Sequence, residues 1–397
     1  MVLSFLHLKN FLRQKWVKIA TISVGIFLLL AVIGSSIYLY VQNVALRAEV
    51  VKNTATIEEI NKEFGDVKSQ DQYKINVALK KQIDQVQTTF TQSVVVYERL
   101  LDLENPPKDL KGLDTLYANV LSQLAKSDYT GAAKSLTDLS LKITAEQSKL
   151  AAVATIPVNV PVSASAPSSG NYSRQQVSTD VGNFMVDIVA GDLGSTKVIV
   201  DTASDSTCGN NCPVLPLATY VSRNGAYAGI NGSYFCPSTY PTCAGKTNSF
   251  DLLLMNKNKT YFNSDNNVYS SNPGVVFGGG YIRFLTAVSQ WGRDTSIDSM
   301  ISNYPLLVLN SNIAFGGSGD SKINSASSRS FVANKGNTVY IGVVHRATTE
   351  QVAHVMKTLG MDNALNLDDG GSAAFWYGGY KVGPGRDLPN VILFVKK

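Results

Sequence analysis

The chain has 397 residues, of which 44% are hydrophobic and 16% charged; this composition excludes a disordered protein and suggests two or three domains. Its formal net charge is +5, but the first 18 residues contain four basic residues and no acidic residue, namely Lys9, Arg13, Lys15 and Lys18. Subtracting those four charges leaves +1 for the rest of the chain. The charge therefore gives no indication of nucleic acid binding, and we expect no nucleic-acid partner.

An uncharged run of 23 residues, Ile19 to Val41, follows this basic tail of residues 1–18. About 20 apolar residues in a helix span a bilayer core, so we expect a transmembrane helix over 19–41. The basic residues before it predict a cytoplasmic N-terminus and an extracellular C-terminal part, as in a single-pass type II protein of the cell membrane. The alternative is a cleaved signal peptide, but the run is longer than usual for one and no clear Ala-x-Ala site follows it.

Four cysteines fall in one short stretch, Cys208, Cys212, Cys236 and Cys243. Because we expect this part of the chain outside the cell, disulfide bonds are their expected use. A zinc site is the alternative, although the Cys-x3-Cys and Cys-x6-Cys spacings are loose for one. Local pairing, Cys208 with Cys212 and Cys236 with Cys243, is the first choice. Four cysteines allow three connectivities, and the sequence leaves the other two open.

Residues 42–154 have the apolar spacing of helices and predict a helical stalk. Two runs repeat at intervals of four and three, each with one polar residue in the seam: Leu46, Val50, Asn53, Ile57, Ile60, Phe64 and Val67, and then Leu79, Ile83, Val86, Phe90, Ser93, Tyr97 and Leu100. This spacing predicts a coiled coil. Pro106-Pro107 is expected to end it, and a helical hairpin of about 110–126 and 130–150 follows. The stalk is either a spacer or a module that makes a homo-oligomer or binds a partner.

A Pro/Ser/Ala-rich segment, 155–171, is expected to be an extended, solvated linker. After it, residues 172–397 alternate short β-rich runs with Gly, Asn and Ser turns. Strands are expected at 183–189, 196–201, 227–231, 252–256, 275–277, 281–285, 306–309, 338–344, 364–367, 373–377 and 391–395. One helix is clear, since Thr348 and Gln351 resemble a capping box and Gly360 can close the helix. The fold class is therefore a transmembrane helix, an α-helical coiled-coil stalk, and an α+β domain with a large mixed β-sheet and few helices.

The loop Asn366–Ser372 combines two adjacent carboxylates with two glycines and a serine, between two apolar runs. Carboxylates at a strand end can act as an acid, a base or a metal ligand. Glycines let the backbone approach a ligand closely. The two carboxylates, Asp368 and Asp369, repel each other, so one of them can hold its proton to a higher pH. Neighbours on a strand point to opposite faces, which would let only one of them reach a substrate.

Three further segments accompany this loop, in the order Asn231-Gly232-Ser233-Tyr234-Phe235, Tyr304–Asn310 and Ser328-Arg329-Ser330-Phe331-Val332. Together the four resemble the patterns NGGFF, GPxLVxNG, PRTAIG and NLDGGGS of the phosphodiester glycosidase family, over about 172–397. The sequence departs from that family at Asp369, where the family has glycine. Further departures are Ser328 for proline, Ser330 for threonine, and Ser311 for the glycine after Asn310.

Together with the expected anchor at 19–41, the resemblance implies a membrane-anchored extracellular hydrolase, a glycosidase that cleaves a sugar-1-phosphodiester in a cell-surface or exported, phosphorylated glycan. The catalytic group would be Asp368, Asp369 and Arg329. His345 is a weaker candidate for acid or base, because it lies at the end of an expected strand and could reach the pocket. Arg329 would bind the phosphate through its planar fork of donors. Substrate-binding residues would be Asn231, Gly232, Ser330, Asn366, Gly370, Gly371 and Ser372. Tyr234, Phe235 and Trp376 are candidates for stacking on a sugar.

Plainer readings stay open for each of these residues. Arg329 can form a surface ion pair, the two aspartates can cap a turn, and His345 can be structural. The same fold could serve a catalytically silent glycan-binding or adhesion module, or a structural envelope protein. No cofactor and no metal site are expected, although the turns Asp265-Asn266-Asn267 and Gly319-Asp320 could bind Ca²⁺.

Overall fold

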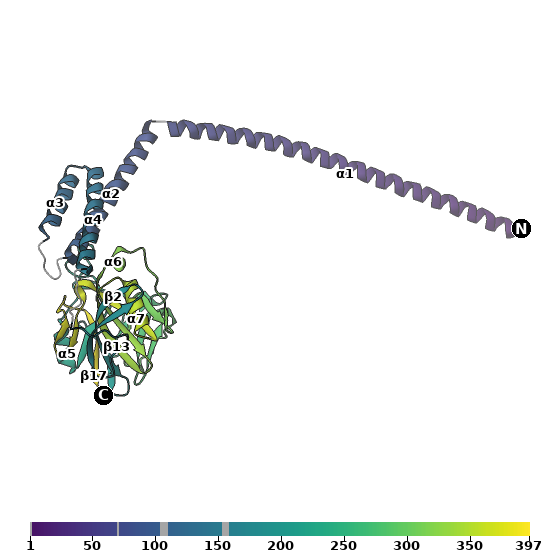
Figure 1. Cartoon of the computed structure of the whole chain (residues 1–397). Coiled ribbons are helices and arrows are strands. Elements are labelled where there is room, and N and C mark those ends of the chain that lie inside the picture. Colours follow the sequence, from purple (N-terminus) through teal and green to yellow (C-terminus); the bar gives the residue numbers. More distant parts are fainter. Residues whose placement is uncertain (1, 70, 104–109, 153–158) are drawn as a thin grey trace. The chain divides into compact units, whose positions relative to one another are not determined.

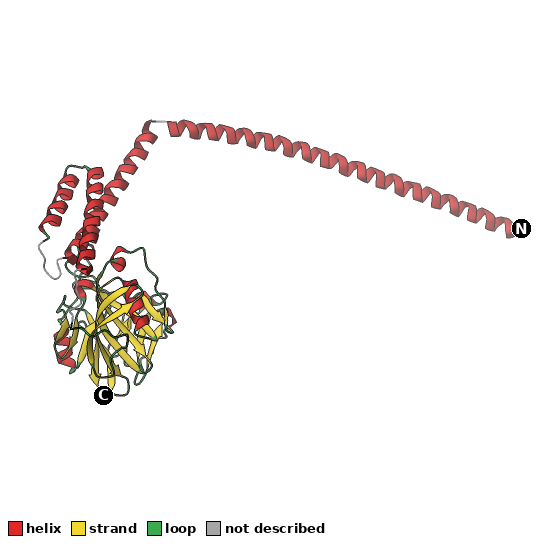
Figure 2. Ribbon diagram, in the orientation of Figure 1, coloured by secondary structure: helices red, strands yellow, loops and turns green. Residues whose placement is uncertain are grey.

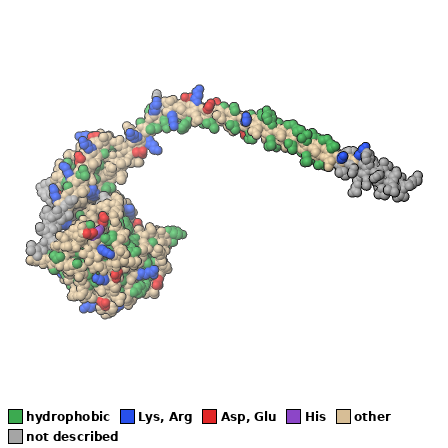
Figure 3. Space-filling model, turned by 45° about the vertical axis from the view of Figure 1, so that its right-hand side comes forward, with side chains coloured by type: hydrophobic (Ala, Val, Ile, Leu, Met, Phe, Trp, Pro, Cys, Tyr) green, Lys and Arg blue, Asp and Glu red, His purple; other side chains and the backbone are tan. Residues whose placement is uncertain are grey.

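The computed structural model describes residues 2–69, 71–103, 110–152 and 159–397, and it divides into two compact units, 1–85 and 86–397 (Figure 1). The first unit contains α1 (Val2–Ser69) and the start of α2 (Asp71–Leu103). Hydrophobic side chains cover a long stretch of α1 (Figure 3), and among the described helices α1 alone is long and apolar enough to cross a membrane. A membrane anchor and a signal sequence both have that property.

The heptad positions of α1 are exposed to solvent, from Leu46 at 57% to Val67 at 48%. Within the described residues of one chain, no second helix covers this apolar face. The coiled coil therefore stays a prediction.

A helical module, which we define as the described residues of 86–152, opens the second unit. It consists of α2 from residue 86, α3 (Lys111–Ala125) and α4 (Tyr129–Ala152), with α3 and α4 forming the predicted hairpin. Its helices bury a core of their own, made by Val96, Leu100, Leu103, Leu110, Val120, Leu124, Ala132, Leu136, Leu139 and Ile143. The predicted stop at Pro106-Pro107 lies outside the described residues.

Residues 159–171, the described part of the expected linker, lie along the first strand of the domain. The Ser163 N–H donates to the Gln176 carbonyl at 2.9 Å, and the Gln176 N–H donates to the Pro161 carbonyl at 2.9 Å. The Gln175 side chain donates to the Ser165 carbonyl at 2.9 Å. This segment is therefore docked on the domain by hydrogen bonds instead of being fully solvated.

Three antiparallel sheets build the C-terminal domain (Figure 2). The first has the order β1-β2-β13-β12-β14-β10-β11, with β1 (Tyr172–Thr179), β2 (Gly182–Asp192), β13 (Thr338–Ala347), β12 (Ser327–Lys335), β14 (Asn363–Asp369), β10 (Leu306–Leu309) and β11 (Asn312–Ile313). The second has the order β16-β15-β4-β17-β3, with β16 (Tyr380–Val382), β15 (Phe375–Tyr377), β4 (Ala228–Asn231), β17 (Asn390–Lys396) and β3 (Thr196–Thr202). The third has the order β6-β5-β9-β7-β8, with β6 (Tyr261–Phe262), β5 (Leu254–Met255), β9 (Ser299–Ser302), β7 (Gly274–Phe277) and β8 (Ile282–Leu285).

The expectation of one large mixed sheet was wrong. Every pairing between these strands in the described residues is antiparallel. The physical reason is the short connection: β1–β2, β7–β8, β12–β13 and β15–β16 are hairpins, whereas parallel neighbours need a crossover of a dozen or more residues.

Short helices complete the domain: α5 (Leu217–Asn224), α6 (Ser321–Asn324) and α7 (Thr349–Thr358), with 3-10 turns η1 (Pro241–Cys243), η2 (Asp265–Asn267), η3 (Val288–Gln290) and η4 (Gly370–Ser372). The predicted capping box of α7 is confirmed, because the Thr348 side chain accepts from the Gln351 N–H and the Gln351 side chain accepts from the Thr348 N–H. Gly360 follows the helix with φ +72°, as a helix-closing glycine does.

Candidate functional site

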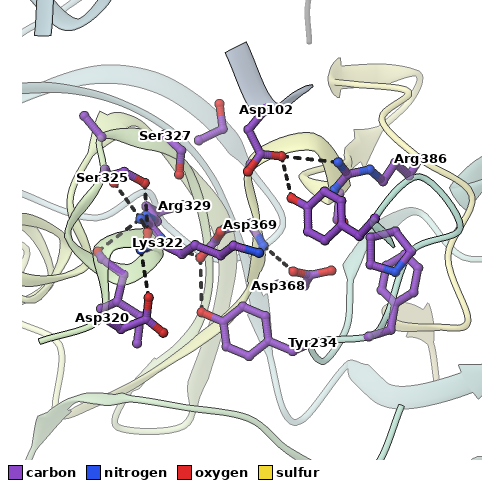
Figure 4. A pocket seen from close by; sticks show the side chains of 18 of the residues that line it. Asp102, Tyr234, Asp320, Lys322, Ser325, Ser327, Arg329, Asp368, Asp369 and Arg386 are labelled. Carbon is purple, nitrogen blue, oxygen red and sulfur yellow. Dashed lines mark hydrogen bonds and ion pairs between the residues drawn. The ribbon is translucent and has the colours of Figure 1, made fainter. Parts of the chain in front are cut away.

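A cavity of about 430 Å³ lies at the C-terminal end of β14. Its lining comes from the β14–η4 loop, the start of β12, the segments 234–243 and 320–328, and the ends of α2 and α4 in the helical module. In Figure 4, Asp368 and Asp369 lie between Arg329 on one side and Arg386 with Asp102 on the other. The loop that drew attention in the sequence is therefore part of a concave site.

A β-bulge brings both carboxylates to this cavity. In the β12–β14 pairing, Arg329 lies opposite Asp369 and Phe331 lies opposite Asn366, so two steps along β12 match three along β14. An extra residue in one strand re-aims its side chains. Asp368 and Asp369 consequently both line the cavity, although neighbours on a regular strand would point to opposite faces.

Asp368 is the buried carboxyl of the pair, with 8% of its surface exposed. Burial raises its pKa to about 8, and the nearby Asp369 carboxylate contributes to the rise. A hydrogen bond from the Asp369 N–H to its Oδ1, at 2.9 Å, opposes that shift only in part. At neutral pH this side chain is therefore a neutral acid that can donate a proton.

Asp369 is held in place by a cation and a phenol. Its Oδ2 accepts from Arg329 Nη1 and, at 3.1 Å, from the Tyr234 hydroxyl. Burial raises the pKa of Tyr234 well above its usual value, so this hydroxyl keeps its proton and stays a donor. The two neighbouring carboxyls thus have different surroundings, one buried against a like charge and the other paired with a guanidinium.

Arg329 uses its donors within the protein. Its side chain is 1% exposed, and besides Asp369 it donates to the carbonyls of Lys322 at 2.6 Å, Ile323 at 3.1 Å, Ser325 at 2.6 Å and Ala347 at 3.3 Å. Three of these contacts fall on Nη2, one on Nε and one on Nη1, so every nitrogen of the guanidinium has a partner. Arg329 lines the cavity, but its geometry is that of a clamp on the 322–325 segment, not of a phosphate fork waiting for a ligand.

Three of the predicted substrate-binding residues do not line the cavity: Asn231, Gly232 and Ser330. They are joined by hydrogen bonds to one another or to the backbone of Asp368. Asn231 Nδ2 donates to the Asp368 carbonyl at 2.6 Å, and its Oδ1 accepts from the Ser330 hydroxyl at 2.7 Å. The Gly232 carbonyl accepts from the Asp368 N–H at 2.9 Å. Gly232 has to be a glycine, because a Cβ there would run into Asn390. The hydrogen bonds of Asn231 and Gly232 hold the backbone of Asp368 in place.

Of the other residues of the 366–372 loop, some line the cavity and some make hydrogen bonds behind it. Gly370, with φ +59°, and Ser372 line the cavity. The buried Asn366 donates to the Tyr234 hydroxyl at 2.7 Å, and the Gly371 carbonyl accepts from the Arg386 N–H at 3.0 Å. Asn366 and Gly371 therefore contribute to the frame of the site.

His345 lies away from this cavity. Its Nε2 is 2.6 Å from Asp187 Oδ2. The same buried carboxylate accepts from Arg174 Nε at 2.8 Å and from the Tyr172 hydroxyl at 2.5 Å. Along β13 the neighbour of His345, Arg346, lines the cavity instead, as alternation of side chains requires. His345 is therefore paired with Asp187 and is not among the residues that line the cavity.

Several residues that line the cavity were not among the predicted site residues: Lys322, Arg346, Arg386, Tyr240, Tyr304 and Asp102. Lys322 and Arg386 lie outside the strands, so no strand pattern in the sequence points to them. Asp102 lies in the helical module, far from the other cavity residues in sequence. Tyr304 belongs to a segment that was singled out, and its ring centroid lies 5.0 Å from that of Tyr234. These two rings, with Phe235 beside them, give the cavity an aromatic wall.

Two disulfides pair the cysteines locally, Cys208–Cys212 and Cys236–Cys243, as first expected. The sulfurs are therefore not zinc ligands. Cys236 and Cys243 line the cavity, and their bond closes the loop that carries Tyr240. Within the described residues, no cluster of three or more His, Cys, Asp and Glu side chains could hold a metal ion.

Comparison with known proteins gives one family match. Residues 224–395 match the family model described as phosphodiester glycosidase. No curated protein matches the chain. The match includes the β4 turn, β12 and the β14–η4 loop, and it excludes the helical module.

Three solved structures are similar to part of the chain. A hypothetical protein from Synechocystis is 12% identical with a TM-score of 0.42, over 57% of this chain and 62% of that one. The zebrafish N-acetylglucosamine-1-phosphodiester alpha-N-acetylglucosaminidase catalytic domain, auto-inhibited by its pro-peptide, is 16% identical with a TM-score of 0.45, over 60% of this chain and 87% of that one. A putative exported protein from Burkholderia pseudomallei K96243 is 11% identical with a TM-score of 0.34, over 54% and 74%. This chain thus spans less than two thirds of the Synechocystis protein, and none of the three likenesses assigns an activity.

Proposed function

From the premise that residues 224–395 form a phosphodiester glycosidase family domain, we propose that this protein hydrolyses a sugar-1-phosphodiester at the bond between the anomeric carbon and the phosphate oxygen. The observation that carries the proposal is the carboxyl pair at the β14 end. Asp368 has its pKa raised to about 8 by burial, and Asp369 is paired with Arg329. Two carboxyls in such unlike surroundings suit an acid and a charge-stabilising group.

In the proposed reaction, Asp368 gives its proton to the bridging phosphate oxygen as the bond from that oxygen to C1 breaks. Positive charge develops on C1 and the ring oxygen, and the carboxylate of Asp369 stabilises it. A water molecule then forms the new bond to C1. One of its protons restores Asp368, so the products are the free sugar and a phosphate monoester.

The aromatic wall supports a sugar substrate. Tyr234 and Tyr304 present ring surfaces beside the carboxylates, and aromatic rings pack well against the apolar face of a sugar ring. The substrate class we propose is a phosphorylated glycan at the cell surface or in exported material, since the disulfides fit an oxidising compartment.

For the N-terminal part we propose an uncleaved type II membrane anchor at 19–41, with the catalytic domain outside the cell. The basic residues before this segment and its length support that orientation. A second copy of the chain is the proposed partner for the exposed heptad face of α1, because its apolar residues repeat at intervals of four and three.

The competing function is a silent glycan-binding module on the same fold. The raised pKa of Asp368 disfavours it, since a binding module has no need of a buried, protonated acid beside a second carboxylate.

The test is turnover of a synthetic panel of sugar-1-phosphodiesters by the full chain in detergent, followed as release of free sugar. We expect Asp368→Asn to lose at least about 100-fold in kcat while it folds normally, because general acid catalysis contributes about 10²–10⁴. The matched control is Asp265→Asn, at an exposed aspartate of the same domain, which should keep full activity. A wild type without turnover on the whole panel would refute the enzyme proposal.

A further inference from the structure

Two carboxylates of the helical module reach into the domain beside the cavity. Glu98 and Asp102 lie on the last turns of α2, one turn apart, and bind side chains of the 236–243 loop and two cations. These helices lie outside the matched family residues, so their part in the site needs a separate explanation.

Glu98 is almost completely buried, and both of its oxygens are used. Oε1 accepts from the N–H of Thr242 at 3.2 Å and from its hydroxyl, and Oε2 accepts from Lys322 Nζ at 2.9 Å. Burial opposes ionisation, but the hydrogen bonds from Lys322 and Thr242 outweigh it and lower the pKa of Glu98. An ionised, fully satisfied carboxylate of this kind is typical of a permanent contact.

Asp102 makes the matching contact with the second cation. Its Oδ1 accepts from the Tyr240 hydroxyl at 2.5 Å and from Arg386 Nη2 at 3.3 Å. Lys322 Nζ and Arg386 Cζ lie 4.3 Å and 4.9 Å from the centroid of the Tyr240 ring. One aromatic ring therefore holds both cations by cation–π contact, and each cation also has one carboxylate from α2.

Lys322 and Arg386 are better placed than Arg329 to receive an anion. Both line the cavity together with Asp368. In Figure 4 the Lys322 side chain extends toward the carboxyl pair, and Arg386 lies on the Asp102 side of it. An ammonium has three donors and a guanidinium has five. Each of the two makes a single bond to α2, which leaves it further donors. All three nitrogens of Arg329, by contrast, already donate to backbone carbonyls or to Asp369.

We propose that Lys322 and Arg386 form the phosphate subsite of the cavity, and that Glu98 and Asp102 of the helical module are positioning residues that hold these two cations on the Tyr240 ring. The subsite places a phosphate next to Asp368, as the proposed proton transfer to the bridging oxygen requires. The helical module is then a wall of the active site and not merely a spacer. This inference rests on the proposed function for its substrate, but its first test does not.

The first test measures binding of inorganic phosphate to the full chain in detergent by titration calorimetry. Lys322→Gln and Arg386→Gln should each weaken phosphate binding at least about tenfold. Glu98→Ala and Asp102→Ala should each weaken it about three- to tenfold, because they free the cations from their positions. Matched controls remove the same kinds of charge from exposed positions, Lys396→Gln on β17 and Asp138→Asn on α4, and should bind as the wild type does.

The second test measures KM and kcat on a sugar-1-phosphodiester. The Glu98 and Asp102 variants should raise KM by the same factor that they lose in phosphate affinity, with kcat changed by less than about twofold. A purely structural role would lower the amount of folded protein instead, without changing KM. If Glu98→Ala does not fold, Glu98→Gln, which keeps the shape of the side chain, should raise KM instead.

The outcomes separate the two proposals. Phosphate binding that depends on all four residues, without turnover on any diester, would overturn the proposed function and leave the subsite standing. Turnover with unchanged KM and unchanged phosphate affinity in the variants would overturn the subsite and leave the function standing. Tighter phosphate binding in Glu98→Ala or Asp102→Ala would also overturn the inference, since the α2 carboxylates would then compete with the ligand.

Discussion

Replacing Asp368 by asparagine should change how the stability of the domain depends on pH. In the native protein the pKa of Asp368 is raised from 3.8 to about 8, first by burial and second by the Asp369 charge. Between these two values the native state keeps a proton that the unfolded chain has released. The contribution of Asp368 to the free energy of unfolding of the wild type therefore falls as pH rises from about 4 to about 8.

The size of this effect follows from the pKa shift. One pKa unit corresponds to about 1.4 kcal/mol, so the whole shift is worth about 6 kcal/mol at most. Asparagine has nearly the same shape and does not titrate, so Asp368→Asn lacks this contribution. Relative to the wild type, the variant should become more stable by several kcal/mol between about pH 5 and about pH 8.5.

The assay is denaturant unfolding of the full chain in detergent at both pH values, followed by tryptophan fluorescence, with Trp291 and Trp376 in the domain as reporters. Asp265→Asn, the exposed control, should follow the wild type at both. If the difference between Asp368→Asn and the wild type stays within about 0.5 kcal/mol across this range, Asp368 titrates like an ordinary carboxyl and the acid we assign is refuted.

Three further changes test the frame of the site. Arg329→Lys should lower the free energy of unfolding by about 1–3 kcal/mol, measured by chemical denaturation, because lysine keeps the positive charge but cannot serve Asp369 and the 322–325 carbonyls at once. The exposed Arg283→Lys should cost under about 0.5 kcal/mol. Equal costs for the two would show that Arg329 is not a clamp. Gly232→Ala should lower the free energy of unfolding by at least about 2 kcal/mol, because the added Cβ would meet the side chain of Asn390 and, at 2.9 Å, the backbone carbonyl of Asn390. Gly279→Ala is the control, since a Cβ there meets nothing within 4 Å. Equal melting temperatures for the two variants would contradict this packing. Replacing Cys236 and Cys243 by serine should lower the free energy of unfolding by about 2.5 kcal/mol, as expected for a closed loop of this length, and should also raise KM because that loop lines the cavity. Cys208 and Cys212 are 4 residues apart and do not line the cavity. Replacing them by serine should lower stability without raising KM, and a rise in KM as large as that of the first pair would contradict the assignment.

Much of the local structure could be predicted from the sequence because it depends on neighbours along the chain. The runs at 338–344 and 391–395 became β13 and β17, and the capping box at Thr348 began α7. The polar strand β1 (Tyr172–Thr179) and the short helix α5 (Leu217–Asn224) went unpredicted. The strand has no strong alternation, and its order comes from pairing with β2, which periodicity does not report.

The site was predictable only in part, because many of its contacts join residues that are far apart in the sequence. Asp368, Asp369, Gly370, Ser372 and Arg329 do line one cavity. The sequence does not show that Arg329 donates to backbone carbonyls, or that a β-bulge brings Asp368 and Asp369 to the same cavity. Both features depend on the register between β12 and β14. Lys322, Arg386 and the helical carboxylates are brought together by contacts across 224 and 284 residues of sequence. No local pattern could have indicated them.

The central claim is that the bond between the sugar carbon and the phosphate oxygen breaks, and the most direct measurement is hydrolysis in ¹⁸O-labelled water. A synthetic sugar-1-phosphodiester is turned over by the wild type, and the released phosphate monoester is weighed by mass spectrometry. Attack of water at C1 puts the label in the sugar and leaves the phosphate unlabelled, which is the result we expect. Label in the phosphate monoester would mean attack at phosphorus, and it would contradict the assignment of Asp368 as the acid of a glycosidase.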